Sequence, residues 1–89
     1  MFVETVTAPR TEWQRWTERL RLFTDPPPAL VCSVAWTSDT DSVTNINVWE
    51  TPSAVADFYE ERVEAVIEAE GPALHKPVRH GAPVAIYLR

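Results

Sequence analysis

Residues 43–71 read VTNINVWETPSAVADFYEERVEAVIEAEG, and the rest of the chain can be placed from them. Alternating β-branched and polar residues predict a strand over Ser42–Glu50. Thr51 or Ser53 can cap a helix directly afterwards. Apolar residues at helical spacing then continue until Gly71 and the proline behind it, which together form a strong stop signal. These residues therefore predict a strand followed at once by one long amphipathic helix.

The predicted strand and helix each have two distinct faces. Side chains alternate along a strand, so Asn45, Asn47 and Trp49 share one face, while Ile46 and Val48 share the other. The helix carries glutamates and an aspartate on its outer side. Its apolar stripe consists of Val55, Phe58, Tyr59, Val63, Val66 and Ile67. We expect this stripe to pack against a sheet.

Two more elements precede this stretch. Residues 2–7 suit an edge or half-buried strand. A helix begins near Pro9 or Arg10, with Thr11 as a possible cap, and three prolines at positions 26–28 prevent it from continuing. Its predicted inner face carries Trp13, Trp16, Leu20 and Phe23.

Residues 29–37 predict a strand with apolar or small side chains on both faces, which indicates cover on both sides. The polar residues 38–41 predict a hairpin turn, and residues 83–89 predict a final strand. The element order is β-α-β-β-α-β, so the sequence predicts one α+β domain over residues 1–89, ferredoxin-like, with a four-stranded antiparallel sheet. A partner subunit is the simplest cover for residues 29–37, so we expect a homodimer.

Composition excludes several classes of function. The net charge is −5, from 13 acidic and 8 basic residues, which disfavours binding to nucleic acid or to anionic membranes. Cys32 is the only cysteine, so an intrachain disulfide and a cysteine-only zinc site are excluded, and we expect a buried thiol. The sequence shows neither a signal-peptide pattern nor an apolar run long enough to span a membrane, so we expect a cytoplasmic protein.

The run Val48-Trp49-Glu50-Thr51-Pro52-Ser53-Ala54, with Phe58, Arg62-Val63 and Gly71 after it, resembles the antibiotic-biosynthesis-monooxygenase-like proteins of the dimeric α/β-barrel superfamily. The resemblance covers about residues 30–89 and is strongest to small uncharacterised members of actinobacterial type. It implies a homodimer whose two sheets close into a barrel, with a pocket between helices and sheet in each subunit.

The resemblance also implies chemistry. Some members oxidise aromatic polyketides without a cofactor, using Asn, Trp, Tyr and Arg side chains. Others degrade heme and rely on a histidine on or near the second helix. The predicted second helix here has no histidine, which argues against heme. The resemblance therefore implies a cofactor-independent, monooxygenase-like protein that acts on a phenolic or enolic compound.

The candidate site follows from these residue types. Amide donors can stabilise an enolate, an arginine can hold an anion, and a histidine can transfer protons. The catalytic candidates are Asn45, Asn47, Arg62 and His75, and the candidates for binding an aromatic substrate are Trp49, Tyr59 and Trp36. No metal or cofactor site is predicted.

Each candidate also has a structural explanation. The asparagines can bond neighbouring groups, Arg62 can pair with a glutamate, and His75 and His80 can be solvated loop residues. Trp13 and Trp16 can fill the core. The alternative prediction is therefore a non-catalytic dimeric module that binds a ligand or serves a structural role.

Overall fold

The computed structural model describes residues 1–38, 40–70 and 78–83. Its elements, in chain order, are β1 (Phe2–Pro9), α1 (Arg10–Leu20), β2 (Leu30–Thr37), β3 (Ser42–Trp49), α2 (Pro52–Phe58), η1 (Tyr59–Val63), α3 (Glu64–Glu70) and β4 (Val78–Pro83). The α+β class with an antiparallel sheet is confirmed, and the arrangement is consistent with a ferredoxin-like fold.

The strands lie in the order β2-β3-β1-β4, and each neighbouring pair is antiparallel. The sequence allowed an edge position for β1, but the structure places it between β3 and β4. The strand beside β1 at the other edge is Val78–Pro83. The final strand predicted at residues 83–89 lies outside the described residues, apart from Pro83.

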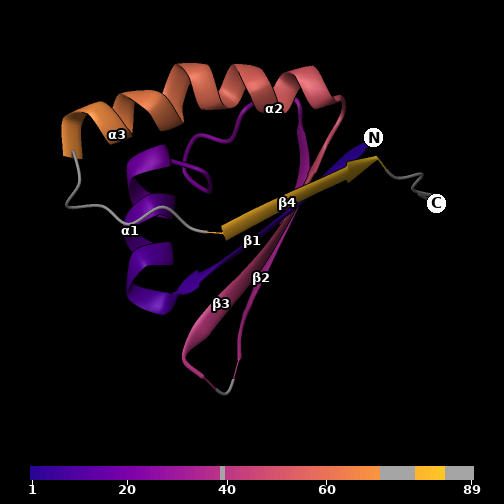
Figure 1. Cartoon of the computed structure of the whole chain (residues 1–89). Helices are drawn as coiled ribbons and strands as arrows, with labels where there is room; N and C mark the ends of the chain where they lie inside the picture. Colours follow the sequence, from indigo (N-terminus) through magenta and orange to yellow (C-terminus); the bar gives the residue numbers. More distant parts are fainter. Residues whose placement is uncertain (39, 71–77, 84–89) are drawn as a thin grey trace.

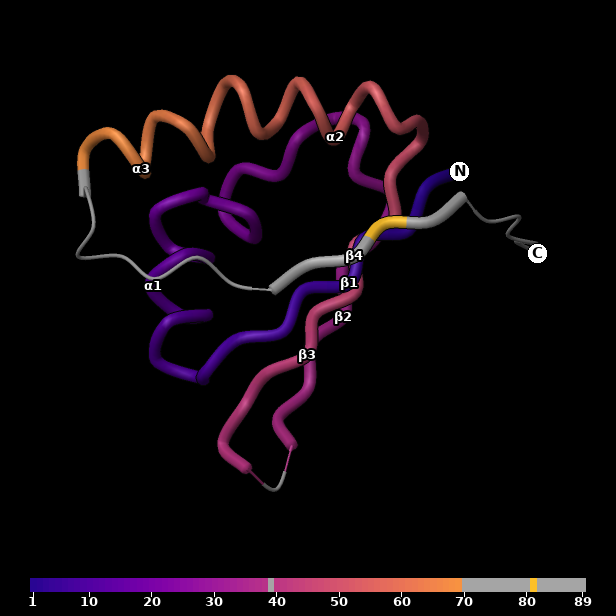
Figure 2. The backbone as a smooth tube through the Cα atoms, viewed as in Figure 1, coloured from indigo at the N-terminus to yellow at the C-terminus, as the bar shows by residue number. Residues whose placement is uncertain are grey.

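Both helical segments lie on one side of the sheet (Figure 1). The smooth tube in Figure 2 shows the strands nearly edge-on, with α1 and the α2–α3 segment on the same side. In the described part of the chain, no helix covers the opposite face of the sheet. The space between helices and sheet is therefore where a core or a pocket can form.

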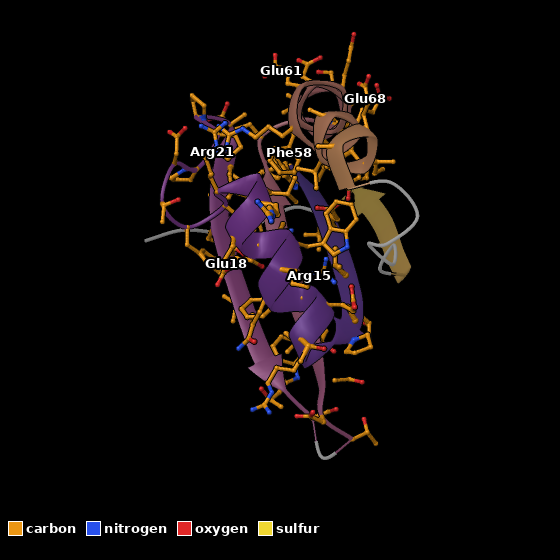
Figure 3. The ribbon with its side chains drawn as sticks, turned by 90° about the vertical axis from the view of Figure 1, so that its left-hand side faces the viewer. Arg15, Glu18, Arg21, Phe58, Glu61 and Glu68 are labelled. Carbon is orange, nitrogen blue, oxygen red and sulfur yellow. The ribbon has the colours of Figure 1, made fainter. Side chains whose placement is uncertain are left out.

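The long helix begins as predicted and contains an unpredicted turn. The Thr51 hydroxyl accepts a hydrogen bond from the backbone N–H of Ala54 at 3.2 Å, which confirms the predicted cap. Between α2 and α3, the five residues of η1 wind as a π-helix. Short π turns inside α-helices often occur at functional sites. Figure 3 shows Phe58 on the inner side of this helix and Glu61 and Glu68 on its outer side.

The core lies between the helices and the sheet. Trp49 is completely buried at its centre, and its ring packs on Phe58 with a centroid distance of 5.1 Å. The other buried residues of this cluster are Trp16, Leu22, Val55 and Val63. The predicted inner face of the first helix was wrong at Phe23, which is 52% exposed. The helix ends at Leu20 because Arg21 is left-handed, with φ 56°, and the chain then turns Leu22 inward.

The edge strand β2 departs most from expectation. A register shift between Leu30 and Cys32 lets Leu30 pair with Trp49 and join the core. Cys32, Val34 and Trp36 alternate onto the opposite face and are exposed, so the prediction of a buried thiol is wrong. Among the described residues, nothing covers β2 on this second face.

Candidate functional site

A cavity of about 250 Å³ lies between the helices and the sheet. Its walls are mostly aromatic and aliphatic, from Val6, Trp13, Trp16, Leu20, Leu22, Phe58, Val63 and Ile67, together with Thr17. Its polar groups come from Glu4, Asn45, Asn47 and Tyr59. An apolar pocket with a few convergent polar groups is the usual form of a small-molecule site, and this volume is slightly below the usual ~300–1,000 Å³.

The strand register gathers the polar groups in one place. Glu4 of β1 lies opposite Asn47 of β3, and Ser33 of β2 lies opposite the same asparagine from the other side. Val6 is likewise opposite Asn45. Side chains that are directly opposite in an antiparallel pair lie on the same face. This row crosses three strands on the face that the helices cover.

Glu4 is at the centre of the polar network and is only 3% exposed. Its Oε1 accepts hydrogen bonds from Asn47 Nδ2 at 3.1 Å and Trp49 Nε1 at 3.4 Å. Its Oε2 accepts from the Tyr59 hydroxyl at 2.5 Å. A carboxylate is a pure acceptor, so these three donors satisfy a buried charge that would otherwise be costly.

Asn45 links the network to the first helix. Its Oδ1 accepts from Trp13 Nε1 at 3.1 Å, and its Nδ2 lies within bonding distance of Ser33 Oγ, the Val34 carbonyl and Asn47 Oδ1. The Ser33 hydroxyl also donates to Asn47 Oδ1 at 2.6 Å. The single oxygen and both hydrogens of this amide group are therefore engaged by the protein itself, so Asn45 forms a fixed wall.

Asn47 is engaged less completely. Its Oδ1 accepts two hydrogen bonds, but the described residues show one acceptor, Glu4, for the two hydrogens of its Nδ2. The orientation of this amide follows from Glu4, because a carboxylate pairs with the nitrogen end and not with the oxygen end. One hydrogen of Asn47 is thus available to a ligand oxygen in the cavity.

Tyr59 is brought to Glu4 by the helix above the sheet. It is the first residue of the π-helical segment and follows Phe58, whose ring it meets edge-on with a centroid distance of 5.9 Å. Glu4 and Tyr59 also line a second, more open hollow of about 410 Å³ with Phe2, Pro52, Val55, Ala56 and Gly81. The Glu4–Tyr59 pair is therefore reached from two hollows.

The structure brings four of the predicted residues together. Asn45, Asn47 and Tyr59 line the cavity. Trp49 lies behind them, where its indole N–H donates to Glu4, but it is completely buried and lines no described cavity wall. It therefore supports the site from behind and does not offer a stacking surface to a ligand.

Two predicted residues lie elsewhere. Arg62 donates to the backbone carbonyls of Leu20 and Asp25 at 3.0 and 2.7 Å, so it joins the helix to the end of α1 and to the segment that follows it. Trp36 is on the opposite face of the sheet, 49% exposed. Neither contributes to the cavity wall, which corrects their assignment to the site. His75 lies outside the described residues.

Sequence reasoning overlooked Glu4. The signal was present, because strand alternation places this carboxylate on the same face as Phe2 and Val6, where an apolar residue is expected. The overlooked role of Trp13 is different: it was assigned to the core, and its ring does line the cavity, but its N–H also holds Asn45. No spacing rule in one sequence predicts that contact.

The described residues contain no group of three or more His, Cys, Asp or Glu side chains that could hold a metal ion. Among them there is also no helix that is both long enough and apolar enough to cross a membrane.

No protein-family model and no curated protein sequence matches this chain. Solved structures do match it over nearly its whole length. One is a protein of unknown function from Nitrosomonas europaea, with a TM-score of 0.66 and 8% identity, covering 99% of this chain and 93% of that one. Another is a putative antibiotic biosynthesis monooxygenase from Chloroflexus aurantiacus, with a TM-score of 0.63 and 14% identity, covering 97% and 95%.

A third is SnoaB, a cofactor-independent oxygenase from Streptomyces nogalater, with a TM-score of 0.63 and 17% identity, covering 98% of this chain and 93% of that one. The chain has the fold of these proteins. At such low identity the likeness establishes the fold and leaves the chemistry to be argued from the site, because one fold hosts many functions.

Proposed function

We propose that the cavity binds a small phenolic or enolic molecule and that the protein is a cofactor-independent, monooxygenase-like enzyme. The observation that carries the proposal is an aromatic-walled cavity with one polar corner, made by Glu4, Asn47 and Tyr59. SnoaB, a cofactor-independent oxygenase, has the same fold, and this likeness supports oxygenation without a cofactor as the reaction.

The proposed reaction uses O₂ as its only oxidant. The ligand hydroxyl loses its proton to Glu4, and the electron pair stays on the ligand as a phenolate or enolate. The anion transfers one electron to O₂, and the two radicals combine into a carbon-bound peroxide anion, which takes the proton back from Glu4 and becomes a hydroperoxide. Where the carbon bearing the hydroperoxide also carries a hydrogen, loss of water leaves a carbonyl, so one oxygen atom enters the product and the other leaves as water. The available N–H of Asn47 stabilises the oxyanion.

The test is O₂ consumption with a panel of one- and two-ring phenols and enolisable ketones, together with product mass. We expect Asn47→Ala to reduce turnover about 10²-fold or more, which is the usual loss when an oxyanion donor is removed. Arg62→Gln is the control and should retain turnover, because Arg62 does not line the cavity. Full turnover by Asn47→Ala would remove this residue from the mechanism.

The alternative function is ligand binding without catalysis. It is favoured by Asn45, whose amide is fully engaged by Trp13, Ser33 and backbone and so has nothing to offer a reacting oxygen. This alternative predicts that phenols bind but that no O₂ is consumed, with wild-type protein as with Asn47→Ala.

We also propose that the chain forms a homodimer through the sheet face that the helices leave open. Val34 is 56% exposed and Trp36 is 49% exposed on that face. Large apolar side chains grouped on an open sheet are typical of an interaction surface. Dimerisation fits both candidate functions, since the cavity opens on the other side of the sheet.

A further inference from the structure

One hydroxyl group in the cavity wall is not used by the fold. Thr17 of α1 lines the cavity, and its hydroxyl makes no hydrogen bond to any described residue. A threonine inside a helix often bonds a backbone carbonyl of the preceding turn, but Thr17 does not. Its oxygen is also accessible, because the only buried side-chain oxygen or nitrogen without a partner in the described chain belongs to Glu12. The Thr17 hydroxyl can therefore bond a molecule in the cavity.

The packing of α1 on β3 decides what lies across the cavity from this hydroxyl. The helix begins beside the start of β3, where the backbone N–H of Arg10 donates to the Asp41 carbonyl at 3.0 Å. Figure 1 shows α1 and β3 running in the same direction from there. The two elements are joined again further along, where the Trp13 indole N–H donates to Asn45 at 3.1 Å. The Trp13–Asn45 bond therefore sets which helix residue faces which strand residue.

Thr17 and Asn47 come next along these two elements. Thr17 is four residues beyond Trp13 on the same helix face, a rise of about 6 Å. Asn47 is two residues beyond Asn45 on the same strand face, a rise of about 6.6 Å. Both residues line the cavity. They therefore lie on its helix wall and its sheet wall, at about the same height.

Both side chains can still bond a ligand. Asn47 has one available N–H, which needs an acceptor oxygen on the ligand. The Thr17 hydroxyl both donates and accepts, so it can bond a hydroxyl or a carbonyl group. Most of the remaining cavity wall is aromatic or aliphatic. A ligand between the two walls can use both groups only if it carries an oxygen at each end of an apolar body.

From this arrangement we infer that Thr17 is a second ligand-binding residue, which makes the cavity select ring compounds with oxygen substituents at two opposite ends. The inference rests on the proposed small-molecule function and specifies its ligand class more closely. It does not depend on turnover, because the selection is made when the ligand binds.

The experiment uses three probes with one ring system. These are 2-naphthol, 2,3-dihydroxynaphthalene, with both hydroxyls at one end, and 2,6-dihydroxynaphthalene, with one at each end. Their binding to the full chain is measured by calorimetry at neutral pH without O₂. We expect wild-type protein to bind the 2,6-diol about fivefold or more tightly than the 2,3-diol, the gain expected from one added hydrogen bond between uncharged groups. The two diols have equal symmetry and equal numbers of hydroxyls, so the difference reports their placement.

Variants assign the preference to the hydroxyl. Thr17→Val replaces it with a methyl group of similar size, so we expect the two diols to bind within about twofold of each other while 2-naphthol affinity stays unchanged. Thr17→Ser keeps a hydroxyl and should keep the preference. Thr11→Val is the matched control, because Thr11 is an exposed residue of the same helix, does not line the cavity and makes no capping bond.

The outcomes separate this inference from the proposed function. If wild-type protein binds the two diols equally, or if folded Thr17→Val keeps the preference, Thr17 is not a second ligand-binding residue, while binding of 2-naphthol still supports a small-molecule site. If folded wild-type protein binds none of the probes, both proposals are overturned. The comparison of the diols on wild-type protein needs no variant, so it decides the matter even if Thr17→Val does not fold.

Discussion

Glu4 is a charged residue on a strand face that otherwise carries Phe2, Val6 and Ala8. Burying a carboxylate there is tolerable because three side chains donate to it, from β3 and from the helix. A buried polar network of this kind stabilises when every member is satisfied and is costly when one member is removed. The same bonds that hold the fold together therefore also shape the polar corner of the cavity.

Removing the hydroxyl of Tyr59 tests how much the hydrogen bonds to Glu4 contribute to stability. Tyr59→Phe keeps the ring but takes one donor from a buried carboxylate, so we expect the free energy of unfolding to fall by about 1–3 kcal/mol. Urea denaturation measures it. In a Glu4→Gln background the same substitution should cost less, because no buried charge is left short of a donor. Equal costs in both backgrounds would show that the Glu4–Tyr59 bond adds nothing to stability.

At the residue scale, the sequence could identify the asparagines as site candidates but not the residues to which they bond. Alternation along β3 correctly placed Asn45, Asn47 and Trp49 on one face. Which strand lies beside that face, and with which register, depends on pairing between distant segments. Glu4 lies in the site because the register of β1 on β3 places it opposite Asn47, so the sequence of β3 alone could not identify it.

The elements themselves were largely predictable because their signals are local. Thr51 caps the helix, and alternation defines β3. The π turn at Tyr59–Val63 and the register shift in β2 were not predictable, because each accommodates packing against elements remote in the chain. The position of Leu22 in the core has a similar cause, since it depends on where α1 stops.

The helix cap provides an element-scale prediction. Thr51→Ala removes the hydroxyl that accepts from the Ala54 N–H, so we expect a loss of about 1 kcal/mol in the free energy of unfolding. Ser53→Ala is the matched control, because the Ser53 hydroxyl contacts only Thr51 among the described hydrogen bonds and both are exposed. Thermal or urea unfolding checks both variants. Comparable losses from the two would contradict Thr51 as the cap.

Arg62 provides the second prediction at the scale of the elements. Its guanidinium joins the helix to the last residue of α1 and to the segment after it through two backbone carbonyls, and its side chain is only 17% exposed. We expect Arg62→Gln to lower the free energy of unfolding by about 1.5–3 kcal/mol, while its affinity for a two-ring phenol such as 2-naphthol stays unchanged. Calorimetry gives both values. Lost affinity in a folded variant would return Arg62 to the site.

At the scale of the whole molecule, the order of elements was enough to predict an α+β, ferredoxin-like arrangement, since few ways exist to pair these strands with short connections. The proposed dimer is a property of the same scale, because β2 exposes its apolar side chains at the open face. The sequence indicated that β2 needs cover on both faces, and the described residues of one chain cover only one of them.

The dimer can be tested by charging its proposed interface. Trp36→Lys places a cation on the open sheet face, so we expect a monomer by light scattering where the wild type is a dimer. Phe23→Lys is the control, because Phe23 is 52% exposed but lies after α1, away from that face. It should remain a dimer. A monomeric wild type, or a dimeric Trp36→Lys, would contradict this interface.

The position of Glu4 in β1 also has a consequence for biosynthesis. The ribosome makes this strand before the residues that pair with it, because the donors to its carboxylate follow 43, 45 and 55 residues later. Until they emerge, β1 lacks a neighbour and carries an unsatisfied acid on its apolar face. Contacts of such long sequence separation form slowly. The nascent chain must therefore extend as far as Tyr59 before the polar corner of the cavity can form.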